Sequence, residues 1–200
     1  MDFVVWRAAS LLLMYPDQRF YDRRPMLRAA VADLPDGVAR RCLDAFLDHV
    51  DGTPPIRMVV HYLEICREGR LLLTKYDDEA RRRSVRERLA GLYEAAGCDF
   101  EDEAEDSLPS LLEYAALCAD DWPLREHRAA LELLHDTLES AGTPYAVPVA
   151  AVRATLAPPV PPQAPPQAPP LAAAPARNAV SLRRPARVYG HDEGRRIINV

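Results

Sequence analysis

The sequence has no run of about 20 consecutive apolar residues, the length that a membrane-spanning helix requires. It also has no run in which apolar and polar residues alternate, and no Asn-Gly or Asp-Gly pair that joins two such runs. The sequence therefore lacks the signals of β-strands and hairpins. These absences predict an all-α fold with no direct membrane insertion.

The patterns that carry catalytic or metal chemistry are missing as well. The eight glycines form neither a phosphate-binding loop nor a Gly-x-Ser-x-Gly nucleophile elbow. A single Glu-x-x-His unit, Glu132 to His135, is present, whereas a di-iron carboxylate site needs two such units and two further glutamates. The remaining histidines lack partners at zinc-ligand spacing: His49, His61, His127 and His191. We predict that the protein is not an enzyme and holds no metal or cofactor.

No Cys-x-x-Cys motif occurs among the four widely spaced cysteines, Cys42, Cys66, Cys98 and Cys118. Three of them lie on or next to apolar helical faces, which predicts buried free thiols in a reducing compartment. The first residues of the chain carry no basic region of the kind that opens a signal peptide. We therefore expect a cytoplasmic protein.

Apolar residues recur at helical spacing through most of the first 156 positions. Two such stripes end at a glycine, a common helix stop: Val85, Leu89, Leu92 and Ala96 before Gly97, and Leu131, Leu134, Leu138 and Ala141 before Gly142. Thr143-Pro144 is predicted to begin the next helix. About eight helices with short connections predict an all-α, single-domain helical bundle over residues 3–156.

A further helix start is predicted near residue 108. Asp106 and Ser107 are N-cap candidates, and Pro109 suits the first turn, where its missing N–H costs nothing. Leu108 and the apolar residues after it follow at helical spacing and should face a core.

The chain changes character after residue 156. Residues 158–170 contain eight prolines, and no convincing period follows them. We predict that residues 157–200 form a disordered, proline-rich tail. This tail carries six arginines against two acidic residues, a net +4, so the total of −5 leaves −9 on the rest of the chain. An acidic body argues against nucleic acid as the partner and permits a basic peptide.

Two charged clusters are each open to two interpretations. Arg81-Arg82-Arg83, with Arg86 and Arg88, is either a DNA-facing helix or a solvated helix face paired with neighbouring acids. The acidic run from residue 99 to residue 106 is either a solvated loop or an electrostatic landing site for an arginine-bearing peptide.

An ordered series of segments resembles the NarJ-type assembly chaperones of respiratory nitrate reductase, over about residues 6–156. The segments are Trp6 to Asp17, with its Tyr-Pro stop, Tyr62-Leu63-Glu64, Leu73 to Tyr76, Glu79 to Ser84, Tyr93 to Gly97, Glu105 to Ala116, and Gly142 to Ala146. The sequence departs from the family pattern at Ile65-Cys66-Arg67, which stand for Thr-Phe-Asp, at Ser84, which stands for Gly, and at Ser107, which stands for His.

The resemblance implies a system-specific chaperone, similar to the broader molybdoenzyme chaperones that recognise twin-arginine leaders. Such a chaperone binds the apo catalytic subunit of respiratory nitrate reductase, chiefly at its leader-like N-terminus. It keeps the subunit competent for molybdenum cofactor insertion and membrane-complex assembly, and delivery proteins for that cofactor are possible further partners.

The resemblance also nominates residues for binding the client peptide. Tyr62 and Tyr76 would form groove walls, and Glu64 would be a carboxylate partner for the leader. The remaining nominees, Asp106, Leu108 and Pro109, would shape the adjoining loop and helix start, and Arg81 and Arg83 would pair with internal or client carboxylates.

Two alternatives remain at this point. One is a helical transcriptional regulator that uses the Arg81–Arg88 helix. The other is a scaffold that recruits partners through its polyproline tail.

Overall fold

The computed structural model describes residues 2–100 and 104–156, and every regular element within them is an α-helix. The helices are α1 (Asp2–Leu12), α2 (Gln18–Asp22), α3 (Arg24–Ala32), α4 (Val38–Gly52), α5 (Pro55–Arg67), α6 (Glu79–Ala95), α7 (Leu108–Cys118), α8 (Trp122–Glu126), α9 (Arg128–Ser140) and α10 (Ala146–Thr155). The all-α prediction is confirmed. The described residues hold ten helices instead of about eight because α2 and α8 span five residues each, too few to show an apolar repeat.

The predicted boundary near residue 156 and the predicted disorder of residues 157–200 fall outside the described residues and stay predictions. No helix among residues 2–100 and 104–156 is both long enough and apolar enough to cross a bilayer.

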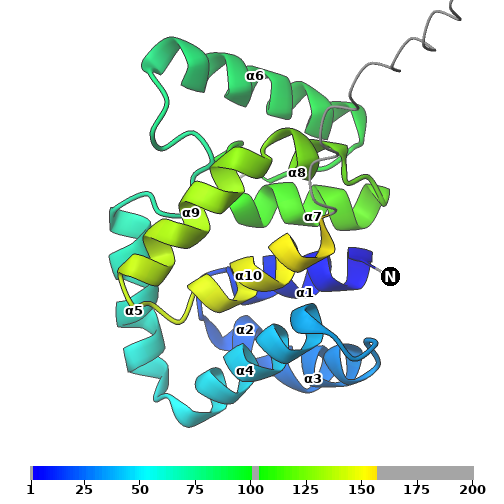
Figure 1. Cartoon of the computed structure of the whole chain (residues 1–200), viewed down its shortest axis with the longest axis vertical. Helices are drawn as coiled ribbons and strands as arrows, with labels where there is room; N and C mark the ends of the chain where they lie inside the picture. Colours follow the sequence, from blue (N-terminus) through cyan, green and yellow to red (C-terminus); the bar gives the residue numbers. More distant parts are fainter. Residues whose placement is uncertain (1, 101–103, 157–200) are drawn as a thin grey trace, which may run out of the picture. The chain divides into compact units, whose positions relative to one another are not determined.

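Helix α1 lies at the centre of the bundle, between α7 on one side and α3 and α4 on the other, with α10 beside it (Figure 1). Seven of its eleven residues are buried, as expected of a helix that other helices surround. Helix α10 in turn packs against α4 and α9. Tyr145, which directly precedes α10, and Phe46 of α4 have the largest fully buried side chains of this core. Their ring centroids are 5.3 Å apart.

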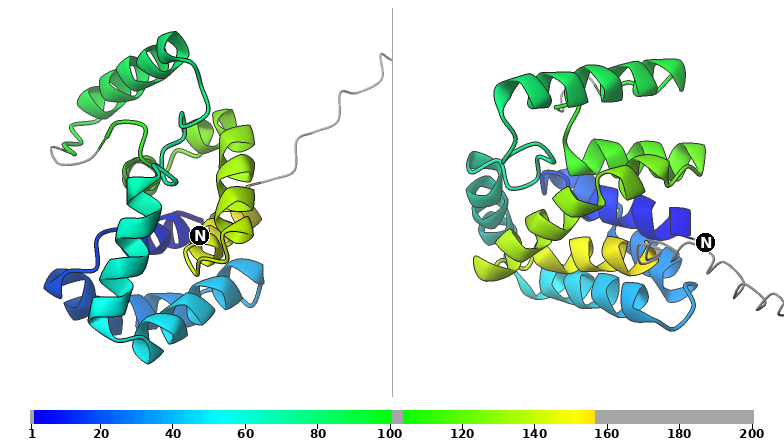
Figure 2. Two further views of the ribbon diagram at one scale, coloured as in Figure 1. Left: turned by 90° about the vertical axis from the view of Figure 1, so that its left-hand side faces the viewer. Right: turned by 45° about the horizontal axis from the view of Figure 1, so that its top comes forward.

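Two helices lie at the periphery. Helix α6 is outermost in both views of Figure 2 and buries only Leu89 and Tyr93. Helix α5 buries Met58, Tyr62 and Ile65 on one face and leaves its other face exposed. Because α6 buries so few side chains, the segments that precede and follow it help to position it and its exposed face.

The predicted helix ends at Ser107, Gly97 and Gly142 agree with the structure, whereas the predicted start of the last helix near Pro144 does not. The Ser107 hydroxyl accepts a hydrogen bond from the backbone N–H of Ser110 and so forms the N-cap of α7, and Gly97 and Gly142 have positive φ just past α6 and α9. Helix α10, however, begins at Ala146 instead of near Pro144. Thr143 and Pro144 form a preceding turn, in which the Thr143 carbonyl accepts from the N–H of Ala146.

The prediction of buried cysteines is wrong, because none of the four is fully buried. Cys66 and Cys118 are exposed, and Cys42 and Cys98 are half-buried, all as free thiols. Cys66 lies near the end of the peripheral helix α5 and Cys118 is the last residue of α7, so neither faces the core.

Candidate peptide-binding groove

A groove with a volume of about 540 Å³ lies between α6 on one side and α8 and α9 on the other. We call it the α6–α9 groove, and its size is typical of ligand sites. Its apolar lining consists of Leu73, Val85, Ala129, Ala130 and Leu133, and Tyr76 lies beside them. Tyr76 and Leu133 are 57% and 46% exposed. An exposed tyrosine and leucine in one concave site are typical of a surface that awaits a partner.

Acidic and basic side chains alternate at the edge of this groove. The Arg88 guanidinium of α6 meets the Glu126 carboxylate of α8 at 2.5 Å, and Arg81 Nε lies 3.3 Å from Asp77 Oδ1. Glu126 thus connects the two sides of the groove through an ion pair. An amphipathic peptide could pack its apolar face on the floor while its basic side chains compete for Asp77 and Glu126.

His127 lies at the same edge of the groove, between the last residue of α8 and the first residue of α9. Its Nε2 atom is buried and accepts or donates no hydrogen bond among the described residues. Burial lowers the pKa of His127, and the nearby Arg88 adds to this effect while Glu126 opposes it. His127 is therefore neutral near pH 7 and adds no positive charge to the groove.

Asp106 holds the connections around α6 in place, although it lies outside the groove. It is fully buried; its Oδ1 accepts from Arg86 Nε of α6 at 2.7 Å, and its Oδ2 accepts from the Thr74 hydroxyl. Its backbone carbonyl accepts from the N–H of Leu73 at 2.9 Å. The carboxylate thus joins α6 to the segment that carries Tyr76, so it positions two sides of the α6–α9 groove.

A second set of contacts joins residues 71–73, before α6, to residues 106–108, after it. Leu72 and Ser107 make an isolated antiparallel bridge, and the Leu108 N–H donates to the Leu71 carbonyl at 2.9 Å. The hydroxyl of Tyr93, buried on α6, donates to the Glu105 carbonyl at 3.0 Å. The interpretation of residues 99–106 as a solvated loop therefore fails for Asp106, while residues 101–103 lie outside the described residues.

The structure separates the residues that the resemblance nominated. Tyr76 and Arg81 line the α6–α9 groove. The second group, Asp106, Leu108 and Pro109, is buried, so these residues can affect binding only through the shape of the loop and helix start.

Tyr62, Glu64 and Arg83 lie elsewhere. Tyr62 is buried, with its ring centroid 5.6 Å from that of Tyr15 and 6.0 Å from that of Tyr145. Arg83 lines a smaller hollow along α6 with Glu79 and Glu105. Glu64 lines a separate hollow beside α5.

Sequence reasoning nominated Tyr76 and Arg81 but missed the other residues that line the groove, among them Leu133, Glu126 and His127. One signal for Leu133 was available, because it falls outside the buried stripe of Leu131, Leu134 and Leu138. An apolar residue on the polar face of an amphipathic helix indicates a possible contact surface.

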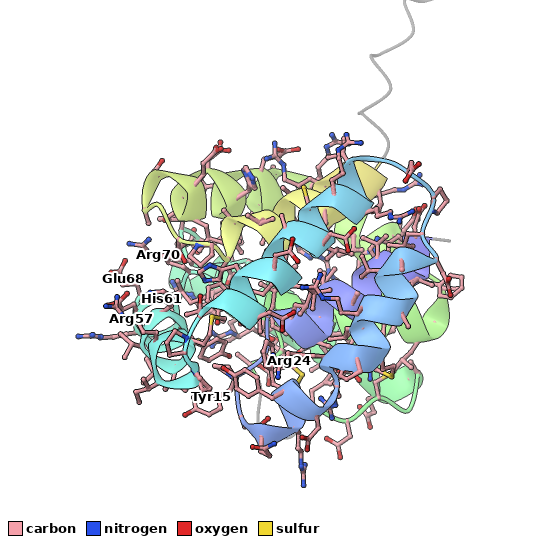
Figure 3. The ribbon with its side chains drawn as sticks, turned by 90° about the horizontal axis from the view of Figure 1, so that it is seen from below. Tyr15, Arg24, Arg57, His61, Glu68 and Arg70 are labelled. Carbon is pink, nitrogen blue, oxygen red and sulfur yellow. The ribbon has the colours of Figure 1, made fainter. Side chains whose placement is uncertain are left out.

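The hollow beside α5 has a volume of about 580 Å³ and is mostly polar. Its residues His61, Glu68 and Arg70 lie on the same side of the molecule in Figure 3, and Arg70 pairs with Glu68 at 2.5 Å. The rings of His49 and His61 stack with centroids 6.1 Å apart, and burial together with His61 lowers the pKa of His49. This hollow lacks the exposed apolar side chains of the α6–α9 groove, so we take the groove as the candidate site.

Both members of the Glu-x-x-His unit of α9 contact the same arginine. Arg153 of α10 pairs with Glu132, and its Nη1 lies 2.6 Å from His135 Nδ1. The donor atoms of His135, Asp136 and Glu139 lie within 4.8 Å of one another. The Arg153 charge opposes a cation at that position.

Four of the five arginines in the cluster on α6 form ion pairs. Arg81 pairs with Asp77, Arg82 with Glu79 at 3.4 Å, Arg86 with Asp106, and Arg88 with Glu126. This arrangement agrees with a paired helix face and disfavours a phosphate-binding surface, which needs uncompensated positive charge.

Comparison with curated proteins finds a relative in two strains of one bacterium. The chain is 30% identical over 158 residues to the nitrate reductase-like protein NarX of Mycobacterium tuberculosis, and the same match occurs in both strains. The match covers 74% of this chain and 24% of NarX, so the chain spans about a quarter of the length of this curated relative. No family model matches the chain.

Proposed function

We propose that the protein is a system-specific chaperone that binds the apo catalytic subunit of respiratory nitrate reductase, chiefly its leader-like N-terminus. In this role it keeps the subunit competent for molybdenum cofactor insertion and membrane-complex assembly, acts in the cytoplasm and catalyses no reaction. The similarity to NarX over 74% of the chain supports the nitrate reductase context, and the ordered NarJ-like segments support the chaperone role.

The observation that carries peptide binding is the α6–α9 groove itself. Exposed Tyr76 and Leu133 offer an apolar surface, and Asp77 and Glu126 offer carboxylates at its edge. Burying one leucine side chain contributes about 1.5–3 kcal/mol, and a micromolar complex needs about 8 kcal/mol in total. A few such anchors together with charge pairing reach that value.

Titration calorimetry with a peptide that copies the N-terminus of a nitrate reductase catalytic subunit tests the proposal. We expect micromolar binding that weakens as salt rises. Leu133→Asp should weaken it at least 10-fold, because it places a carboxylate on the apolar floor. Leu117→Asp is the matched control, since Leu117 is 61% exposed but lies outside the groove.

Two results would contradict parts of this proposal. A folded protein that does not bind the peptide would refute leader recognition. Equal weakening by Leu133→Asp and Leu117→Asp would refute the groove as the site, and a selective loss with Glu64→Ala would move the site to the hollow beside α5.

A further inference from the structure

Helix α5 is apolar on two faces. Its inner face packs into the bundle through Met58, Tyr62 and Ile65. On its outer face the side chains of Ile56, Val60 and Leu63 are 71%, 46% and 50% exposed. A surface helix ordinarily places polar residues opposite its buried stripe, so the packing of the bundle does not account for this second apolar face.

The three exposed residues form one line along the helix. Val60 follows Ile56 by four positions, and Leu63 follows Val60 by three, which is the spacing of residues that share one helix face. We call this line the α5 stripe. Helix α5 runs along one edge of the bundle (Figure 1), where the stripe is open to solvent. Single exposed apolar residues are common on protein surfaces, whereas a contiguous apolar surface marks a contact with a partner.

Two opposite charges lie on one flank of the α5 stripe. Arg57 and Glu64 are seven positions apart, so they lie on the same side of the helix, about 10 Å apart along its axis. Both are exposed, and Arg57 lies on the outer side of α5 in Figure 3. Neither side chain forms an ion pair or a hydrogen bond with another described residue. The flank therefore offers one unpaired cation and one unpaired anion to a partner.

A second copy of the same helix satisfies both charges when the two helices run antiparallel. In a two-fold symmetric contact, residue i of one copy meets residue j of the other, and j meets i. Antiparallel packing of the two stripes, with Val60 near the two-fold axis, brings Arg57 of each copy close to the level of Glu64 of the other. A parallel arrangement would place equal charges at the same level, so the opposite charges would not meet.

We propose that the α5 stripe is a homodimer interface, in which α5 of one copy packs antiparallel against α5 of a second copy. Ile56, Val60 and Leu63 supply the apolar contact, and the two Arg57–Glu64 pairs set the direction of the helices. This inference is independent of the proposed chaperone function, because none of the three apolar residues lines the α6–α9 groove.

The contact is small, so the dimer should be weak. One helix of 13 residues meets its copy over about 20 Å, and interfaces of such limited size are typical of transient complexes. We therefore expect monomers in dilute solution and dimers as the concentration rises.

Sedimentation equilibrium of the full chain tests the interface. We expect the average mass to rise from 22.3 kDa toward twice that value as the protein concentration approaches several hundred micromolar. Leu63→Asp should raise the dissociation constant at least 10-fold, because it places two carboxylates in the apolar contact. Leu117→Asp is the matched control, since Leu117 is 61% exposed on α7 and should leave association unchanged. Circular dichroism should show equal helix content in both variants.

Exchange of the two charges tests the direction of the helices. Arg57→Glu and Glu64→Arg should each weaken association at least 10-fold, because each change brings like charges together at both contacts. The Arg57→Glu/Glu64→Arg variant should recover the association of wild type. An equimolar mixture of the two single variants should form a heterodimer, because opposite charges then meet at both contacts.

Several results would overturn this proposal. One is a mass of 22.3 kDa at every concentration, and another is equal weakening by Leu63→Asp and Leu117→Asp. Single charge variants that associate like wild type, or a double variant as weak as they are, would refute the antiparallel pairing. If Leu63→Asp weakens leader-peptide binding by a protein that stays monomeric, the α5 stripe binds the client instead. Leu133→Asp tests the chaperone proposal separately, so either proposal can fail alone.

Discussion

Asp106 gives the sharpest test of how this fold positions its peripheral helix. Its carboxylate is fully buried and binds Arg86 of α6 and the hydroxyl of Thr74. Asp106→Ala removes both acceptors and leaves the guanidinium and the hydroxyl without their partner. We expect the protein to lose stability and α6 to loosen before the rest of the bundle.

The magnitude follows from the burial of the two partners. Removing one member of a buried ion pair costs about 3–5 kcal/mol. The Arg86 side chain is 36% exposed and can regain water, so Asp106→Ala should lower the free energy of unfolding by about 3 kcal/mol. For a domain of this size about 1 kcal/mol shifts Tm by roughly 2–4 °C, so the expected drop is roughly 6–12 °C.

Urea denaturation followed by circular dichroism measures the free energy of unfolding, and a double-mutant cycle with Arg86→Ala isolates the pair. The coupling between the two changes should be about 1–2 kcal/mol. Glu94→Ala, at an exposed site on the same helix, should change stability by less than about 0.5 kcal/mol. If Asp106→Ala lies within that control range, the carboxylate does not hold α6 and the reasoning is wrong.

Two further predictions concern stability. The pKa values of His49 and His127 are lowered in the fold, so the unfolded chain binds protons first as pH falls below about 6.5. The free energy of unfolding should therefore decrease from pH 7 to pH 5, and the His49→Gln/His127→Gln variant should show a flatter dependence in pH-dependent urea denaturation. Ala119 has φ +51°, so Ala119→Gly should raise stability by about 0.5–1 kcal/mol in thermal unfolding, whereas Ala29→Gly inside α3 should lower it by about 1 kcal/mol.

The local signals of the sequence predicted much of the fold. The stripe of Leu131, Leu134 and Leu138 is buried on α9, and the start of α7 follows from the side chain of Ser107 and the fixed φ of Pro109. These features depend on residues three or four positions apart, which is why periodicity and capping rules identify them.

The candidate site was much less predictable. Tyr76 and Arg81 were nominated and do line the groove, but Leu133 and Glu126 reach it from a part of the chain about 50 positions away. The order of residues in the sequence does not show that α8 and α9 lie near α6. That approach depends on the contacts between the segments that precede and follow α6, such as the bridge between Leu72 and Ser107.

The sequence by itself determined that the chain folds as helices and where most of them stop. Only the tertiary structure decided that Asp106, the last residue of an acidic run, is buried against Arg86 and Thr74. The physical reason is that a helix forms through neighbours in the chain, whereas the environment of the Asp106 carboxylate is set by partners some 20 to 30 positions away.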